Sequence, residues 1–409
     1  MKVSFVTVGC RMNQFDTDLL RSKFFAEGYE VGEGFEKADV YVINTCTVTS
    51  GGDRSSRQAI FRAKRKNPDA IVVATGCLAQ VRPDQLASIP EVDLIIGNTH
   101  KSEIVKILED YLSSRKERVH VGEIFREKRL KNFDTVTYFE GSRPFIKIQE
   151  GCNRFCTFCV IPFARGKVRS ADPQRVVDQV RILADMGFGE VVLSGTQLSQ
   201  YGWDLGTSLY QLLLELIKTD ISLIRLSSMH IGEMDDNLID LITSEEKIAP
   251  HFHLSLQSGS DKILERMGRG YTLAEYSKIV EKIVVKRPPS AVGTDIIAGF
   301  PGEGEREFGE TLKAVKELPF AYIHVFPYSD RPFTRSQSFG NKVRETVKKD
   351  RVAILREVDC RKREEFLEKN RGRRLRAVVL NSGKVLTENY IELLRETGQK
   401  PGKLVTVEV

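Results

Sequence analysis

Short apolar runs alternate with longer amphipathic stretches along the first hundred residues. The apolar runs are rich in β-branched residues, and each ends at or beside a glycine, asparagine or threonine; they are residues 3–8, 39–44, 71–75 and 92–97. Runs of this kind are typical of buried strands. Residues 15–26 and 54–66, which lie between them, have a helical pattern. This βα alternation predicts an open parallel sheet with helices on its faces.

A second alternation of the same kind begins near residue 145. Its predicted strands are residues 145–149, 190–193, 223–227, 252–256, 292–297 and 322–326. The amphipathic stretches between them are residues 173–186, 209–217, 236–242, 273–285 and 305–318. Six strands in one βα series predict a partial (β/α)6 barrel, whose working site should lie at the carboxyl ends of the strands.

The last third of the chain changes character twice. Residues 346–369 have a charged helical pattern, and residues 373–409 alternate in the manner of a small all-β module. A chain of 409 residues is too long for one ordinary core. We therefore expect an α/β protein in four parts: an N-terminal α/β domain (1–118), a linker (119–142), a barrel (143–370) and a short β module (371–409).

Composition narrows the class of protein. The chain is 41% hydrophobic and 29% charged, and these fractions are typical of soluble globular proteins. It has neither an apolar run of about 18 residues nor the apolar stretch of a signal peptide, so we expect a cytoplasmic location and no membrane partner. Seven cysteines are an unsuitable number for a disulfide framework and indicate metal or catalytic sites.

Three of these cysteines, Cys152, Cys156 and Cys159, have the spacing C-x3-C-x2-C directly after the first predicted barrel strand. Three thiolates on one loop can hold three irons of a [4Fe–4S] cluster and leave the fourth iron open for a ligand. The alternative is structural zinc, which takes four ligands. Because no fourth cysteine or histidine stands close by in the sequence, the iron–sulfur interpretation is favoured.

Cys10, Cys46 and Cys77 each follow a different predicted strand of the first series. Taken singly, each could be a small buried apolar side chain. Since the carboxyl ends of parallel strands lie along one edge of a sheet, the three should converge there. Convergence of three thiols predicts a second metal cluster, again with one open iron.

Basic residues are concentrated in two regions, although the net charge is only +6. The first region consists of Arg54, Arg57, Arg62, Lys64, Arg65 and Lys66. The second spans residues 341–376 and includes Arg373 and Arg374. Such patches suit a phosphate backbone, but solvated helix faces would look the same from charge alone.

Several motifs, in order, resemble one family along nearly the whole chain: the radical-SAM methylthiotransferases, where SAM is S-adenosylmethionine. They are TVGCRMNQ, INTCTVT, TGCLAQ, GCNRFCTFCVIPFARGKVRS, LSLQSGSDKILERMGRGYT, TDIIAGFPGE and HVFPYSDRPFT. The resemblance implies an N-terminal methylthiotransferase domain, a radical-SAM barrel and a short TRAM-like RNA-binding module. Phe333 departs from it, because glycine is usual at that place.

The resemblance also implies cofactors. A [4Fe–4S] cluster on Cys152, Cys156 and Cys159 would bind SAM and cleave it to a radical that abstracts hydrogen. A second [4Fe–4S] cluster on the other three cysteines would hold the sulfur, and a second SAM would supply the methyl group. The residues implied in SAM binding are Phe158, which would pack on adenine, and Gly195, Thr196, Gln197, Ser227, Ser228, Gln257 and Asp295.

Members of this family act on adenosine-37 of tRNA or on an aspartate of a ribosomal protein. The motifs around Cys10, Cys46 and His324 are most similar to the branch specific for N6-threonylcarbamoyladenosine. N6-isopentenyladenosine and the ribosomal aspartate remain alternatives, and a non-catalytic iron–sulfur RNA-binding protein is an alternative of another class. The partners implied are a tRNA anticodon stem-loop, a low-potential electron donor of flavodoxin or ferredoxin type, and a sulfur donor. We expect a monomer.

Overall fold

The protein structure is a computed structural model that describes residues 1–131 and 141–409. Its N-terminal part is a six-stranded sheet in the order β2-β1-β3-β4-β5-β6, with every pairing parallel. The strands are β1 (Lys2–Thr7), β2 (Glu30–Glu33), β3 (Val40–Thr45), β4 (Ile71–Gly76), β5 (Leu94–Ile96) and β6 (Val119–His120). The helices are α1 (Arg11–Ala26), α2 (Ser50–Lys66), α3 (Cys77–Val81), α4 (Pro83–Ala87) and α5 (Ile104–Ser114).

The open parallel sheet predicted for this part is confirmed, with small differences at element ends. The sequence pattern missed the short edge strands β2 and β6, and β6 lies within the stretch expected to be a linker. Helix α2 begins four residues before the predicted start, because the Thr49 hydroxyl accepts a hydrogen bond from the Gly52 amide and caps it. Residues 132–140 of the expected linker lie outside the described residues.

The central part is a partial barrel of six parallel strands in chain order. They are β7 (Phe145–Glu150), β9 (Glu190–Gly195), β10 (Leu223–Leu226), β11 (His251–His253), β12 (Ala291–Ala298) and β13 (Tyr322–Pro327). The ladder is continuous from β7 to β10 and from β11 to β13. Two isolated parallel bridges, Ile224–Ile248 and Met229–Leu254, join the two halves. The predicted (β/α)6 arrangement is confirmed.

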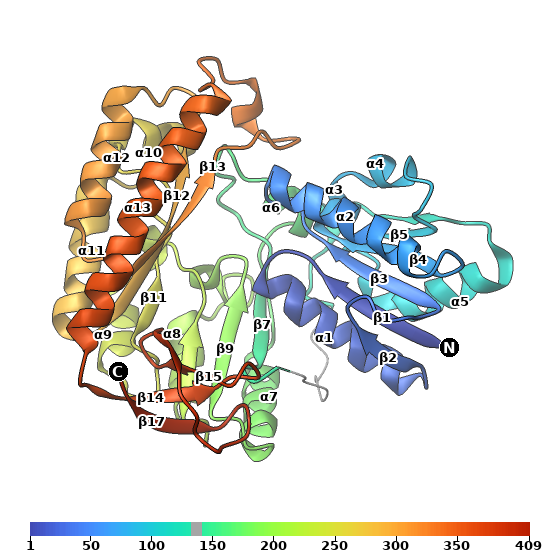
Figure 1. Cartoon of the computed structure of the whole chain (residues 1–409), viewed down its shortest axis with the longest axis horizontal. Coiled ribbons are helices and arrows are strands. Elements are labelled where there is room, and N and C mark those ends of the chain that lie inside the picture. Colours follow the sequence, from blue (N-terminus) through green and yellow to red (C-terminus); the bar gives the residue numbers. More distant parts are fainter. Residues whose placement is uncertain (132–140) are drawn as a thin grey trace.

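Helices cover the outside of this barrel, as Figure 1 shows. They are α7 (Pro173–Asp185), α8 (Leu209–Leu216), α9 (Asp236–Ser244), α10 (Asp261–Met267), α11 (Leu273–Lys286) and α12 (Glu305–Glu317). The short helix α6 (Ile161–Arg165) instead lies against α3 of the N-terminal part. Their apolar faces and the strands form one large core, which contains Leu193, Phe252 and Val292. A two-residue strand, β8 (Arg169–Ser170), pairs antiparallel with β7.

The C-terminal part is a long helix and a four-stranded antiparallel sheet in the order β16-β15-β14-β17. The elements are α13 (Glu345–Asn370), β14 (Arg374–Val379), β15 (Lys384–Thr387), β16 (Glu392–Leu394) and β17 (Leu404–Glu408). The sheet packs on the foot of the barrel (Figure 1), where buried Arg225 donates hydrogen bonds to the carbonyls of Thr387 and Glu388. The small all-β module is thus confirmed, and it depends on the barrel for part of its packing.

No helix in the described ranges is both long and apolar enough to cross a membrane. The N-terminal domain lies along the side of the barrel where β7 is, with α1 against that strand (Figure 1). This placement brings the carboxyl edge of the N-terminal sheet to the mouth of the barrel.

Candidate active site

Cys152, Cys156 and Cys159, the barrel triad, lie on the loop between β7 and α6, at the mouth of the barrel. The loop begins with Gly151 at a φ of 77°, where a Cβ atom would lie 1.9 Å from the Lys167 carbonyl oxygen, so only glycine fits. Burial and then the charge of Cys156 raise the pKa of Cys152 to about 11. Arg269 donates to the Cys156 sulfur at 3.5 Å and would stabilise the thiolate.

Cys10, Cys46 and Cys77, the N-terminal triad, follow the adjacent strands β1, β3 and β4. The structure brings them together at one edge of the sheet. A Cβ atom on Gly9 would lie 2.8 Å from the Cys46 sulfur. Burial, and then the charges of Cys77 and Cys10, raise the pKa of Cys46 to about 12. The three thiols are therefore close enough to influence one another electrostatically.

The spacing of the sulfurs separates the two metal interpretations. One tetrahedral zinc ion with Zn–S bonds of about 2.3 Å holds its sulfurs about 3.8 Å apart. Across the described ranges, no three cysteine sulfurs lie within 4.8 Å of one another. Triads that interact electrostatically but are too wide for one ion fit a larger iron–sulfur cluster. The donor sets are therefore suited to [4Fe–4S] clusters rather than to zinc.

The two triads approach each other across the domain boundary. Cys77 packs in one apolar cluster with Val160 and Ala164, which directly follow the barrel triad in the sequence. Burial raises the pKa of Cys77, and the nearby charge of Arg165 opposes that rise. Arg165 belongs to α6 of the barrel, so the barrel supplies a positive charge to the N-terminal triad.

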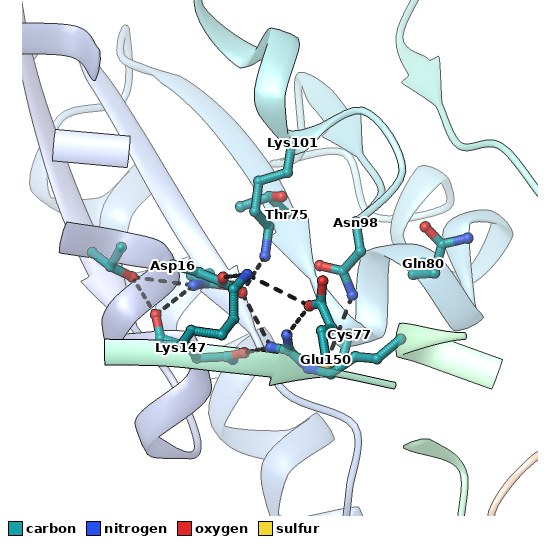
Figure 2. A network of polar contacts seen from close by, with 12 residues as sticks. Asp16, Thr75, Cys77, Gln80, Asn98, Lys101, Lys147 and Glu150 are labelled. Carbon is teal, nitrogen blue, oxygen red and sulfur yellow. Dashed lines mark hydrogen bonds and ion pairs between the residues drawn. The ribbon is translucent and has the colours of Figure 1, made fainter. Parts of the chain in front are cut away.

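A buried network of charged side chains surrounds this contact (Figure 2). Asp16 of α1 accepts hydrogen bonds from Lys101 at 2.9 Å, from Lys147 at 2.6 Å and from Arg165 at 3.1 Å. Burial raises the pKa of Asp16, but these three cations outweigh burial and hold it well below its usual range. Glu150 pairs with Arg165 and, at 3.3 Å, with Arg169. Four cationic side chains thus face two carboxylates, and the excess positive charge would stabilise neighbouring thiolates.

A pocket of about 200 Å³ adjoins the barrel triad. Three of the residues implied in SAM binding line it: Phe158, Gln257 and Asp295. Val48 and Thr49 of the N-terminal domain also line it, so the pocket lies between the two domains. Gln257 has a φ of 78°, unusual for a residue with a side chain, which indicates a position held for function.

The other residues implied in SAM binding lie at the ends of β9 and β10. The Thr196 hydroxyl accepts from the Gly151 amide at 3.2 Å, and Gln197 donates to Glu233 at 2.9 Å. Gly195 ends β9. The buried Ser227 hydroxyl makes no hydrogen bond within the described part of the chain, whereas Ser228 bonds the His253 ring at 2.8 Å.

His253, Asp295 and His324 form a group that sequence reasoning assigned only in part. The Asp295 Oδ1 atom lies 3.3 Å from His253 Nε2 and 3.5 Å from His324 Nδ1. The ligand atoms all lie within 4.8 Å of one another, so this group has the size to hold a single cation. Burial raises the pKa of Asp295, but the His253 charge and hydrogen bonds from its neighbours lower it far below its usual range. The available signal was that these three residues lie on the neighbouring strands β11, β12 and β13.

Aromatic rings close the foot of the barrel, and sequence reasoning missed them. Tyr390, from the turn between β15 and β16, stacks on His251 at 4.0 Å, and His251 bonds the Tyr322 hydroxyl at 2.8 Å. Arg11, which follows Cys10, donates to the Tyr390 hydroxyl at 2.7 Å. Arg11 is half-buried, and none of the carboxylates in the described ranges forms an ion pair with it.

The residues expected to bind RNA occupy two separate surfaces. Arg54, Arg65 and Lys66 are exposed on α2, and Arg57 is half-buried there. Arg62 lies over the Phe35 ring at 4.2 Å, and Lys64 pairs with Asp93 at 2.9 Å, so both also have structural contacts. Arg373 and Arg374 are exposed at the start of β14, on the other side of the molecule from α2 (Figure 1).

Comparisons with known proteins agree with this geometry. Residues 2–97 match the Uncharacterized protein family UPF0004, and residues 146–315 match the Radical SAM superfamily. Among solved structures, the cobalamin- and [4Fe-4S]-bound radical S-adenosylmethionine methyltransferase TsrM from Kitasatospora setae has a TM-score of 0.63 at 16% identity. That match covers 82% of this chain and 77% of TsrM, and it concerns the fold alone.

Two relatives are similar over most of their length. The protein named threonylcarbamoyladenosine tRNA methylthiotransferase MtaB, from Aquifex aeolicus (strain VF5), is 65% identical over 408 residues, which is 100% of both chains. A tRNA-2-methylthio-N(6)-dimethylallyladenosine synthase from Dictyoglomus thermophilum is 34% identical and covers 85% of this chain and 80% of its own. The chain therefore belongs to the radical SAM methylthiotransferase family, in its threonylcarbamoyladenosine tRNA methylthiotransferase branch.

Proposed function

We infer that this chain adds a sulfur and a methyl group at C2 of N6-threonylcarbamoyladenosine-37 in tRNA. The observation that carries the proposal is the pair of thiol triads, which meet where Cys77 packs against Val160 and Ala164. Methylthiolation needs a site that makes a C–H bond reactive next to a site that holds sulfur. A single cluster would serve for the first requirement only.

Each part of the site has a role in this reaction. When bound, SAM and the two clusters supply the one-electron chemistry and the sulfur. The barrel triad would hold one cluster beside the pocket lined by Phe158 and Asp295, and the N-terminal triad would hold the other. Arg269 and Arg165 each place a guanidinium beside a triad, where it stabilises thiolates over thiols. The network around Asp16 fixes the two domains relative to each other.

Arg11 supports the threonylcarbamoyl substrate over the dimethylallyl one. Its guanidinium lies beside the rings of Tyr390 and Phe145 and contributes to lowering the pKa of His251. A cation in this position matches the carboxylate that a threonylcarbamoyl group carries. A dimethylallyl group is apolar and would leave the guanidinium without a counter-charge. We therefore propose that Arg11, which directly follows Cys10 of the N-terminal triad, binds the substrate carboxylate.

The direct test is an anaerobic reaction of cluster-reconstituted protein with SAM, a strong reductant and tRNA that carries threonylcarbamoyladenosine. Mass spectrometry of the digested tRNA should detect the 2-methylthio derivative. Methylthiolation of tRNA with a dimethylallyl group, but not with a threonylcarbamoyl group, would contradict the substrate assignment. Failure to release 5′-deoxyadenosine from SAM would contradict the enzyme assignment as a whole.

The remaining partners follow from the chemistry. We propose an anticodon stem-loop of tRNA as substrate, a low-potential electron donor and a separate sulfur donor. We also propose that the protein acts as a monomer in the cytoplasm. The exposed basic side chains of α2, among them Arg54 and Arg65, support contact with RNA phosphates.

A further inference from the structure

Four phenylalanines form a patch on the outer side of the barrel triad. Phe155 lies between Cys152 and Cys156 in the sequence, and its ring centre is 6.1 Å from that of Phe125 and 6.2 Å from that of Phe163. Phe163 is 5.6 Å from Phe333. We call these four residues the phenylalanine patch.

Two rings of the phenylalanine patch are exposed and lie on strained backbone, and packing inside the protein explains neither feature. The side chain of Phe333 is 62% exposed and that of Phe155 is 39% exposed. Both residues also have positive φ angles, 65° and 49° respectively, a strained conformation for residues with a side chain. Exposed aromatic rings held in strained backbone indicate a surface that is used for binding.

The phenylalanine patch and the pocket lined by Phe158 lie on different sides of the loop that carries the barrel triad. Phe158 lines the pocket with Asp295 and packs with Phe300 and Tyr328. Phe155, three residues earlier, instead contacts the other members of the patch. The side chains of the triad loop thus separate a substrate side, with the pocket, from a solvent side, with the phenylalanine patch.

The exposed charges around the patch are mainly positive. The segments that carry it are residues 121–131, 153–168 and 329–337. Their exposed basic residues are Arg126, Lys128, Arg129, Lys131, Lys167 and Arg335. Of these, Arg126 pairs with Glu123 and Lys131 pairs with Glu127, so four basic side chains remain: Lys128, Arg129, Lys167 and Arg335. The other exposed acidic residue, Asp330, pairs with Lys342. A small apolar centre within a basic rim fits a transient complex with an acidic protein.

We propose that the phenylalanine patch is the docking surface for the electron donor, an acidic low-potential electron-transfer protein. In each encounter the donor loses one electron and the iron–sulfur centre of the barrel triad gains it, with no bond made or broken. This docking proposal rests on the proposed function only because that function needs a reductant. The docking test does not use tRNA, so failure of the docking proposal can be told from failure of the proposed function.

The test compares Phe333→Gly with the wild-type holoenzyme. Glycine suits the positive φ at this position, so loss of the ring should not disturb folding. We expect the Kd for reduced flavodoxin, measured by calorimetry, to rise about tenfold. Flavin oxidation, followed by absorbance, should slow in parallel, while SAM cleavage driven by dithionite is unchanged. Arg335→Glu should have the same direction of effect, and Phe25→Ala, at a 64% exposed phenylalanine of α1, should have none.

Three results would overturn the proposal. Flavodoxin that binds the wild type and Phe333→Gly equally would show that the patch is not its docking surface. Weaker tRNA binding with unchanged flavodoxin binding would assign the patch to base stacking instead. Loss of SAM cleavage even with dithionite would mean that Phe333 supports the loop structure.

Discussion

Lys147 of β7 donates a hydrogen bond to Asp16 of α1 at 2.6 Å, and neither side chain is more than 1% exposed. The pair joins the barrel to the N-terminal domain. Removing one partner of a buried ion pair leaves the other charge uncompensated, which costs about 3–5 kcal/mol. We expect Asp16→Ala to lower the free energy of unfolding by about this amount, measured by urea denaturation. Asp178→Ala removes an exposed pair with Arg181 and should change it by less than about 1 kcal/mol.

The two triads should be separable by substitution. Cys152→Ala removes a ligand of the SAM-binding centre, so we expect no 5′-deoxyadenosine from SAM. Cys46→Ala should leave that cleavage intact and abolish methylthiolation of tRNA. Cys360 is exposed and belongs to neither triad, so Cys360→Ala should retain both activities. Retained methylthiolation in Cys46→Ala would contradict the role of the N-terminal triad.

Cluster-free protein should show protonated thiols well above neutral pH. The pKa of Cys46 is about 12 and that of Cys152 about 11, against an ordinary value of 9.0. Since both values are raised in the folded state, these thiols contribute stability below about pH 9 that is lost as the pH rises toward 12. At pH 8, iodoacetamide should label exposed Cys360 much faster than Cys46, as mass spectrometry would report. Equal labelling rates would contradict the burial of Cys46.

Arg11→Gln should change substrate preference. A hydrogen bond from a guanidinium to a carboxylate contributes about 1.5–3 kcal/mol, so kcat/KM for threonylcarbamoyl-bearing tRNA should fall roughly ten- to hundredfold. For tRNA with a dimethylallyl group, kcat/KM should not fall. Iron content and tRNA-independent SAM cleavage report on structural damage and should stay at the wild-type level. An equal fall for both tRNAs would assign Arg11 a structural role.

Exposed arginines of α2 should contribute to tRNA binding through phosphates. Each contact adds about 0.7–0.9 to the magnitude of the slope of log K against log salt. The double variant Arg54→Ala/Arg65→Ala should therefore bind more weakly and with a slope smaller by roughly 1.5. Lys313→Ala/Lys316→Ala, which removes two exposed cations of α12, is the charge-matched control. An unchanged slope in the double variant would mean that α2 faces away from the RNA.

Much of the architecture could be predicted from periodicity, because strands and amphipathic helices leave regular patterns. The convergence of Cys10, Cys46 and Cys77 followed from their places after strands of one parallel sheet. The short strands β2, β6 and β8 were missed, since runs of two to four residues carry little pattern. They form through pairing with a neighbour that the sequence does not identify.

The charged network could not be predicted for a different reason. Lys147 alternates with apolar residues in FIKIQE and reads as a solvent-facing position of a strand. Its partner Asp16 is 131 residues away, in a helix whose pattern gives no sign of a buried carboxylate. The same holds for Arg11 and Tyr390, which are 379 residues apart. Such contacts depend on how domains pack, and a single sequence carries no direct record of that.

The position of Arg165 has a consequence for the exchange of domains between relatives. This side chain belongs to the barrel, yet it bonds Asn13 at 2.7 Å and Asp16 at 3.1 Å, both in the N-terminal domain. A chimera that joins the first domain of one family member to the barrel of another inherits half of this network from each parent. Such a hybrid should be productive only when both parents carry compatible charges here, so the two halves must diverge together.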